Sequence, residues 1–421
     1  MVRFYSSVVL SLLFLTGCVD ESRDVVSGEI TENSGGVDDG DSSAATFDRQ
    51  ALMTNLVDNI FIPNYEVAAT QATAFATESG SLSTYCDDIG TDNEAISMIA
   101  AQTDWLGLME SVQKTEMHVI GPALRNEDAL HNRMHSYSTS PLATCALDQA
   151  VIAAADDSFQ ITSRAYSQRG MGAIEYLLFN ENLNHSCSSQ ISVTANWNDQ
   201  PESQRKQQRC ALAEYIAEDV ATASNQIHSE WTEGDVPFRT DFLNPESLGD
   251  NFQLITDGLF YLETFTKSQK LAIPLGLDAK CSSLTCVGLV ESPYSESSLR
   301  NVRTNAAEFL RIFNGGTGPG FDDLIDREDF GYITQRFQTQ LGAIDSKLAL
   351  MTVSLFDQIA LVEADADDPT CINAFLNPDD ESLIEACSLT GLLKRVTDDL
   401  KIEFVTIVGV AIPGRVQSDN D

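Results

Sequence analysis

Apolar residues recur at helical spacing along most of this chain. The longest stripe advances in steps of three and four residues, as in a helix that buries one face: Phe330, Ile333, Phe337, Leu341, Ile344, Leu348, Met351, Leu355 and Ile359. Shorter stripes occupy residues 212–231, 248–262 and 299–313, and Asn314-Gly315-Gly316 after the last is typical of a helix end. Strand-like alternation is scarce. The sequence therefore predicts an all-α fold built from helical bundles.

The helical stripes fall into two groups. Helical segments are predicted between residues 47 and 179, and Pro63 should kink or break the first of them. A polar connection that contains Cys187 follows up to residue 209, and helices then continue to the end. We therefore expect an N-terminal bundle over residues 47–209, which includes the connection, and a C-terminal bundle over residues 210–421.

The first 46 residues have a different composition. Arg3 precedes an apolar run over residues 8–15, which is too short to span a bilayer and is followed by Leu-Thr-Gly-Cys. This pattern resembles the lipobox of bacterial lipoproteins, which implies a signal peptide over residues 1–17 and lipidation of Cys18. Residues 18–46 are rich in Asp, Glu, Ser and Gly, which predicts a disordered acidic tether. We expect a lipid-anchored protein of the cell envelope, at the outer membrane and facing the periplasm.

The net charge of the chain limits the kinds of molecule that it is expected to bind. The 421 residues include 63 acidic and 25 basic side chains, which gives a formal net charge of −38. Nucleic acid is an unsuitable partner, because phosphate binding requires a basic surface. No segment after the signal peptide reaches the ~18 uninterrupted apolar residues of a spanning helix, so membrane attachment is expected only through Cys18. We expect a monomer.

Cysteine usage agrees with export. Besides Cys18 the chain has eight cysteines: Cys86, Cys145, Cys187, Cys210, Cys281, Cys286, Cys371 and Cys387. An even number in an exported chain indicates disulfides, although eight cysteines allow 105 pairings. We favour sequential pairs, 86–145, 187–210, 281–286 and 371–387, because each would close a loop between predicted helices. A cysteine metal site is less favoured, since the sequence has no C-x-x-C pair.

Two acidic residues lie on apolar faces of predicted helices. Glu116 is seven residues after Met109, and Glu175 shares a face with Met171 and Leu178. A carboxylate shielded from water requires a cation or several hydrogen-bond donors. The nearby Arg164 and Arg169 could supply the cation. A structural ion pair and a ligand site are equally consistent with this pattern.

The segment R-G-M-G-A-I-E-Y-L-L-F, residues 169–179, resembles the signature region of the imelysin family. Further pieces occur in the order typical of that family: Trp105 with Glu116 and Gly121-Pro122, L-A-I-P-L-G at residues 271–276, V-E-S-P-Y-S-E-S-S-L at residues 290–299, and Asn305 followed by N-G-G. The family comprises exported bacterial proteins, often lipoproteins, that are associated with iron uptake and were historically classed as peptidases. The resemblance extends from residue 47 to the C-terminus and implies two packed helical bundles.

One position departs from the family motif G-x-H-x-x-E. Gly170 and Glu175 are retained, but Gly172 occupies the histidine position. This replacement removes the side chain best suited to a borderline metal ion, and it argues against peptidase action. The chain therefore looks like a branch of imelysin-like lipoproteins that lacks this histidine.

Other chemical motifs are sparse. His131 and His135 have the i, i+4 spacing that can chelate a metal on a helix, but a turn-like segment follows, so we expect the pair at the surface near a helix end. Ser292 and Ser295 have no histidine base nearby in the sequence, and Ser295 is expected to cap a helix that begins near residue 296.

These observations predict a non-enzymatic envelope lipoprotein that binds a small ligand or an envelope partner connected with iron acquisition. Iron or another divalent cation could be bound, although the sequence requires no cofactor. The resemblance places the site in a cleft at the domain junction, lined by Glu116, Arg164, Arg169, Gly170, Glu175, Glu291, Ser292, Tyr294 and Asn305, with Glu291 facing Glu175. Two alternatives are a metal-dependent peptidase, as the older family name implies, and a structural partner of an outer-membrane receptor.

Overall fold

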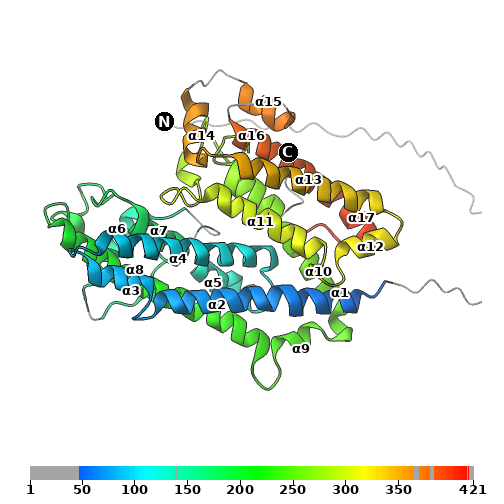
Figure 1. Cartoon of the computed structure of the whole chain (residues 1–421), viewed down its shortest axis with the longest axis horizontal. Helices are drawn as coiled ribbons and strands as arrows, with labels where there is room; N and C mark the ends of the chain where they lie inside the picture. Colours follow the sequence, from blue (N-terminus) through cyan, green and yellow to red (C-terminus); the bar gives the residue numbers. More distant parts are fainter. Residues whose placement is uncertain are drawn as a thin grey trace, which may run out of the picture. The chain divides into compact units, whose positions relative to one another are not determined.

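The computed structural model describes residues 47–135, 137, 141–156, 158–364, 369–379, 384–414 and 416. The predicted signal peptide, Cys18 and the tether lie outside the described residues. Every regular element in the described part of the chain is helical, and that part contains no strand, which confirms the all-α prediction. Figure 1 shows the helices in sequence colours.

The first half of the chain contains eight α-helices and several short helical turns among the described residues. The helices are α1 (Arg49–Leu56), α2 (Ile62–Ala76), α3 (Ser81–Asp88), α4 (Glu94–Thr115), α5 (Arg125–Met134), α6 (Thr144–Ala153), α7 (Gly170–Phe179) and α8 (Glu202–Thr232). The turns are η1 (Val57–Phe61), η2 (Glu116–His118), η3 (Gly121–Ala123), η5 (Ile161–Ser163), η6 (Tyr166–Gln168) and η7 (Ser192–Thr194). Pro63 does not end the helical path, because the π-helical η1 joins α1 to α2 directly before it.

The second half contains nine α-helices in the described ranges: α9 (Phe238–Phe242), α10 (Leu248–Leu259), α11 (Ser298–Phe313), α12 (Phe321–Arg327), α13 (Gly331–Leu350), α14 (Leu355–Ala364), α15 (Thr370–Leu376), α16 (Glu385–Asp399) and α17 (Val405–Val408). Shorter or π-helical elements are η8 (Pro245–Ser247), η9 (Leu262–Ala272), η10 (Val287–Leu289) and η11 (Leu400–Phe404). The long stripe that predicted one helix is divided between α13 and α14. The division has a local cause: Ser354 caps α14, since its hydroxyl accepts a hydrogen bond from the backbone N–H of Asp357.

Packing joins helices from distant parts of the chain. The 31-residue α8 packs on α2, α7, α5 and α3, while α16 packs on η9 and α13, and α13 on α11. The predicted boundary between residues 209 and 210 falls inside α8, and the described residues from 47 onward form one compact unit. The division into two bundles stays a prediction. Helix α4 contacts α11 (Figure 1). The turn η2 contacts both α10 and α11, so Glu116 in η2 lies where early and late helices meet.

The described residues form four disulfides, and two of the predicted pairs are wrong. Cys281–Cys286 and Cys371–Cys387 are confirmed. The other bonds are Cys86–Cys210, which links α3 to α8, and Cys145–Cys187, which links α6 to the connection after α7. The sequential pairs fail because α3 packs directly on α8, and this contact brings residues 124 positions apart together.

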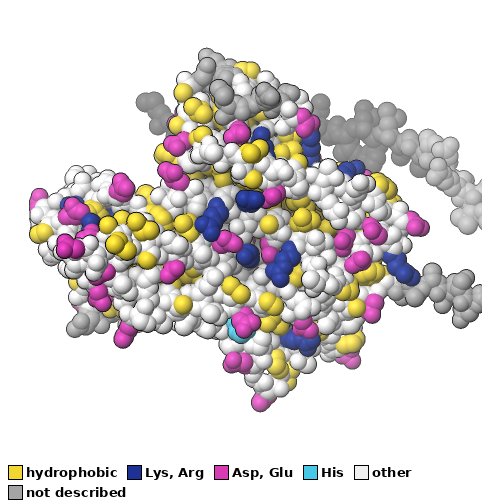
Figure 2. Space-filling model, in the orientation of Figure 1, with side chains coloured by type: hydrophobic (Ala, Val, Ile, Leu, Met, Phe, Trp, Pro, Cys, Tyr) yellow, Lys and Arg dark blue, Asp and Glu magenta, His cyan; other side chains and the backbone are white. Residues whose placement is uncertain are grey.

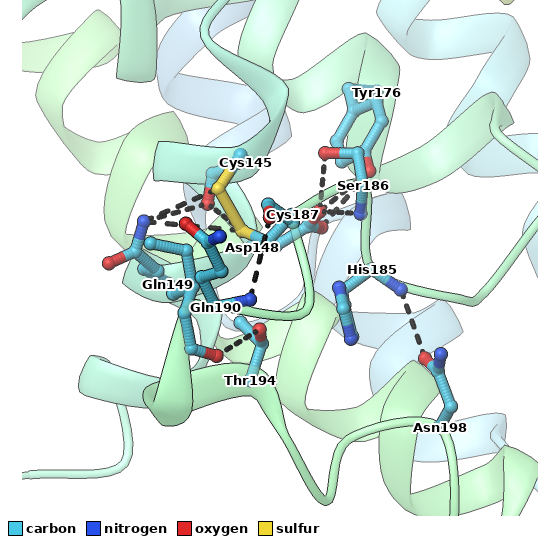
Figure 3. The surroundings of a disulfide bond; sticks show 12 residues. Cys145, Asp148, Gln149, Tyr176, His185, Ser186, Cys187, Gln190, Thr194 and Asn198 are labelled. Atoms are coloured by element: carbon cyan, nitrogen blue, oxygen red, sulfur yellow. Dashed lines mark hydrogen bonds between the residues drawn. A yellow bond between two sulfur atoms is a disulfide. The ribbon is translucent and has the colours of Figure 1, made fainter.

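A polar residue lies beside the Cys145–Cys187 disulfide. Asp148 is buried and accepts hydrogen bonds from the hydroxyl of Tyr176 and from the backbone N–H and hydroxyl of Ser186, at 3.0, 2.6 and 2.8 Å (Figure 3). The disulfide and this carboxylate thus fix the connection against α6 and α7.

None of the described helices is long and apolar enough to span a bilayer.

Candidate functional site

A buried polar network lies where α4 and α5 meet η9 and α11. Its members share almost complete burial, none being more than 4% exposed: Gln113, Glu116, His131, His135, Lys270, Glu291 and Asn305. Glu116 follows α4 on the face that also carries Met109, as its helical phase predicted. Charged and amide groups removed from water in this way must satisfy one another.

Glu116 is held by two cationic partners. Its Oε1 lies 2.9 Å from Nδ1 of His135, and its Oε2 lies 2.6 Å from Nζ of Lys270. Burial by itself would raise the pKa of Glu116, but the charges of His135 and Lys270 outweigh it and hold this pKa well below its usual range. Lys270 also donates to Oδ1 of Asn305 at 2.8 Å and to the amide oxygen of Gln113. The carboxylate is therefore fixed at both oxygens.

His135 lies between two carboxylates. Its Nε2 is 2.7 Å from Oε1 of Glu291, on the ring edge opposite Glu116. Burial lowers the pKa of His135, but the two carboxylates prevail and raise it to about 9. Asn301 donates to Oε2 of Glu291 at 3.0 Å, and the side chain of Gln113 donates to Oε1 at 3.1 Å. Glu291 thus lies in this network, with His135 as its nearest charged partner, and no described contact joins its carboxylate to Glu175, which it was expected to face.

His131 lies one turn before His135 on α5. The prediction that this pair lies at the surface is wrong, because both side chains are at most 2% exposed. Burial lowers the pKa of His131 to about 4, so the imidazole is neutral at physiological pH. Its Nε2 is buried and receives no hydrogen bond from any residue that the structure describes. Glu116, His131 and His135 each offer one donor atom, and these three atoms lie within 4.8 Å of one another.

Glu175 occupies a second polar site on α7. Its Oε2 accepts a 2.7 Å hydrogen bond from the hydroxyl of Tyr137. Its Oε1 accepts from the backbone N–H groups of Tyr294 and Ser295, at 2.9 and 2.7 Å, and from the Ser295 hydroxyl at 2.9 Å. Burial outweighs these bonds and raises the pKa of Glu175 to about 7.

The arginines expected beside Glu175 serve other residues. Arg169 forms an ion pair with Asp219, 2.9 Å from Nε to Oδ2, and Arg133 holds the second oxygen at 2.6 Å. Arg164 lies over the ring of Phe159, 5.1 Å from its centroid. Arg164 and Arg169 therefore do not act as cationic partners of Glu175 among the described contacts. The ion pair that the sequence allowed between Glu175 and an arginine is not formed among the described residues, because Arg169 binds Asp219 instead.

Ser295 does not cap a helix. Helix α11 begins at Ser298 with Ser297 as its N-cap residue, whereas the hydroxyl of Ser295 bonds to Glu175. Ser292 is buried, and its hydroxyl accepts a 3.2 Å hydrogen bond from Asn301. The segment before α11 thus delivers Glu291 to the buried network and Tyr294 to Glu175.

A cleft of about 440 Å³ reaches the Glu175 site from the surface. Its lining is largely apolar, with Leu142, Val290, Pro293 and Phe356, and it also includes Tyr137, Tyr294 and the acids Glu296 and Asp357. Both tyrosines contact Glu175, through the hydroxyl of Tyr137 and the backbone of Tyr294. The ring of Tyr137 is also 6.1 Å from the ring of His135, centroid to centroid. Tyr137 therefore lies beside the cleft, Glu175 and His135 of the buried network.

A comparison with protein-family models matches residues 61–383 to the family described as Imelysin, Peptidase M75. The chain belongs to the imelysin family. Among solved structures, an imelysin-like protein from Psychrobacter arcticum 273-4 is similar over 87% of this chain and 96% of its own, with 16% identity and a TM-score of 0.60. A putative iron-regulated protein A precursor from Parabacteroides distasonis ATCC 8503 gives 85% and 97% coverage, 16% identity and a TM-score of 0.56. No curated protein matches the chain.

The imelysin motif region forms the start of α7. Gly170 is its first residue and has a φ of 72°, a left-handed conformation that favours glycine, so the backbone itself explains the retained glycine. Gly172 provides no side chain where the motif has histidine. Glu175 consequently binds hydroxyl and backbone donors in this imelysin.

Sequence reasoning identified part of this site. Glu116, Glu291 and Asn305 lie in one network, with Ser292 beside it, while Glu175 and Tyr294 lie together at the cleft. The residues it missed are Gln113, Tyr137, Ser295 as a ligand of Glu175, Lys270, and the burial of both histidines. The i, i+4 histidine spacing was a usable signal, whereas nothing in the sequence around Lys270 indicated that its amine reaches Glu116.

Proposed function

We propose that this imelysin-family protein is a non-enzymatic envelope protein that binds a small ligand or partner connected with iron acquisition. The observation that carries the proposal is the cleft beside Glu175. Its walls are largely apolar and include two tyrosines that bind Glu175, an acid with a pKa of about 7, and ligand sites typically pair apolar walls with a few polar groups. The ligand would enter from the side of Tyr294 and Phe356.

The link with iron is supported by the family and by the name of one structural relative, an iron-regulated protein A precursor. The location in the envelope is supported by the lipobox-like segment that ends at Cys18 and by four disulfides, which persist in oxidising compartments. We infer that the protein is anchored by lipid in the outer membrane, faces the periplasm as a monomer and binds no nucleic acid.

A metal-dependent peptidase is the second candidate, and one observation favours it. His131, His135 and Glu116 form the two-histidine, one-carboxylate set that hydrolytic zinc sites use. All three side chains are buried, however, and a peptide bond would have to reach them past Tyr137 and Glu291. A purely structural partner of an outer-membrane receptor is the remaining alternative.

The test is complementation of a deletion strain under iron limitation. Wild-type protein should restore growth and uptake of radioactive iron, whereas Tyr294→Ala and Glu175→Gln should not, at matched protein levels. Tyr332→Ala is the control, since Tyr332 is an exposed tyrosine outside the cleft lining. Unchanged growth of the deletion strain would contradict the iron link. Full complementation by both cleft variants would favour the structural alternative, and casein hydrolysis that is lost in His135→Ala would favour the peptidase.

A further inference from the structure

We propose that Glu116, His131 and His135 bind one divalent transition-metal ion of the borderline class, such as Zn²⁺ or Fe²⁺. This inference deepens the proposed function by naming a ligand class, and it rests on that function only for its biological purpose. The site is separate from the motif on α7, because its donors come from η2 and from the end of α5.

The donor set fits the chemistry of these ions. Imidazole nitrogen and carboxylate oxygen are their usual ligands. His131 on α5 and His135, the residue that follows the helix, have their ring centroids 5.9 Å apart. The three donor atoms lie within 4.8 Å of one another. Metal–ligand bonds of about 2.0–2.2 Å place tetrahedral donors roughly 3.4 Å apart, so small side-chain rotations would close the site. Three protein ligands also leave one position for a ligand or water.

The surrounding groups orient the donors as metal sites require. A metal-binding histidine usually donates its second ring N–H to a carboxylate, which aims the first nitrogen at the ion. Nε2 of His135 is 2.7 Å from Glu291, which leaves Nδ1 facing Glu116. Lys270 holds Oε2 of Glu116 and leaves Oε1 on the side of His135. Asn301 and Gln113 in turn fix Glu291.

His131 distinguishes a metal site from a structural ion-pair network. The ion pairs among Glu116, His135, Glu291 and Lys270 do not involve His131. Nε2 of His131 is nevertheless buried, and no described residue donates to it or accepts from it. A buried polar atom in this position is costly unless it gains a partner. A metal ion held between Glu116 and His135 supplies that partner.

The experiment uses the full-length protein, extracted in detergent and stripped with a chelator. Isothermal titration with Zn²⁺, and with Fe²⁺ under anaerobic conditions, should show one ion per chain. We expect His131→Ala to weaken binding at least tenfold and Glu291→Gln to weaken it about tenfold, whereas His228→Ala on α8 should bind as the wild type does. Absence of stoichiometric binding by the wild type, or wild-type affinity in His131→Ala, would overturn the proposal.

Two further measurements keep the outcome clear. If His131→Ala does not fold, the X-ray absorption spectrum of the zinc-loaded wild type decides: two imidazoles with oxygen ligands support the site, and oxygen scatterers alone reject it. Tyr294→Ala should retain metal binding. If metal binding fails while iron-limited growth still depends on Tyr294, only the metal inference is wrong; if metal binds but growth is independent of Tyr294, the proposed function is wrong.

Discussion

The hydroxyl of Tyr137 donates a 2.7 Å hydrogen bond to Oε2 of the buried Glu175. With the donors at Oε1, this bond satisfies a carboxyl group that has no basic side chain among its hydrogen-bond partners in the described residues. Burial still dominates and raises the pKa of Glu175 to about 7. The acid is therefore partly protonated near neutral pH, and this property distinguishes it from a structural ion pair.

We expect Glu175→Gln to raise the free energy of unfolding at pH 7, by as much as about 2–3 kcal/mol, because the neutral amide avoids the burial of charge that raises the pKa of Glu175. The amide has nearly the same shape, its oxygen can accept the bonds at Ser295, and the Tyr137 hydroxyl can rotate to accept from the amide NH₂. Urea unfolding measures the change. A loss of about 3–5 kcal/mol, as for a buried pair broken on one side, would mean that Glu175 has a cationic partner after all.

The pH dependence of stability should carry the signature of Glu175. The folded-state pKa of about 7 exceeds the ordinary value of 4.5, so the folded state binds the proton more tightly. The resulting stabilisation is complete below pH 4.5 and is lost as the pH rises through 7. The difference in unfolding free energy, wild type minus Glu175→Gln, should therefore fall by about 2–3 kcal/mol between pH 4.5 and 7.5. A difference that is flat over this range would contradict the raised pKa.

Asp219→Asn should destabilise the fold by about 3–5 kcal/mol. The carboxylate of Asp219 is buried and neutralises both Arg133 and Arg169, so the change leaves two guanidinium groups without their counter-charge. Arg303→Gln is the control, because its ion pair with Asp345 is about half exposed and should contribute less than about 1 kcal/mol. Urea unfolding of both variants makes the comparison, and equal effects would show that the buried pair contributes no more than the surface pair.

The two long-range disulfides should be found by mass mapping of the oxidised protein. Peptides that contain Cys86 and Cys210 should be linked, as should those with Cys145 and Cys187. Replacing Cys86 and Cys210 together by serine should cost about 2–4 kcal/mol, more than the same change at Cys281 and Cys286, because the longer loop constrains the unfolded chain more. Thermal unfolding compares the two double variants; an equal loss would contradict the loop-length argument.

Cys18→Ser should release the protein from the membrane fraction into the periplasm or the medium. The lipobox interpretation makes acyl chains on Cys18 the expected anchor. None of the described helices is long and apolar enough to span a bilayer. Fractionation in high salt and carbonate, followed by immunoblotting, measures the distribution. Retention of the variant with membranes would show that the lipobox interpretation is wrong or that a second anchor exists.

Several features of this protein could be predicted from sequence because they depend on local spacing. The stripe at residues 299–313 and the following Asn-Gly-Gly predicted α11 and its end, and apolar phase predicted the burial of Glu116 and Glu175. The face of a helix on which a residue lies depends only on the spacing of its neighbours in sequence, so it can be predicted without knowledge of the rest of the fold. The short disulfides at residues 281–286 and 371–387 follow the same logic.

Which residues far apart in the sequence bind one another was decided only by the tertiary structure. Arg169 is six residues from Glu175 but binds Asp219, whereas the donors to Glu175 come from residues 137, 294 and 295. Cys86 reaches Cys210 because α3 packs on α8. His131 and His135 appeared to end a surface helix, yet the packing of α5 on α8 and α7 leaves both buried, with His135 against Glu116. Sequence spacing determines which face of a helix is buried, but the partner on the other side depends on contacts between segments that are far apart in the chain.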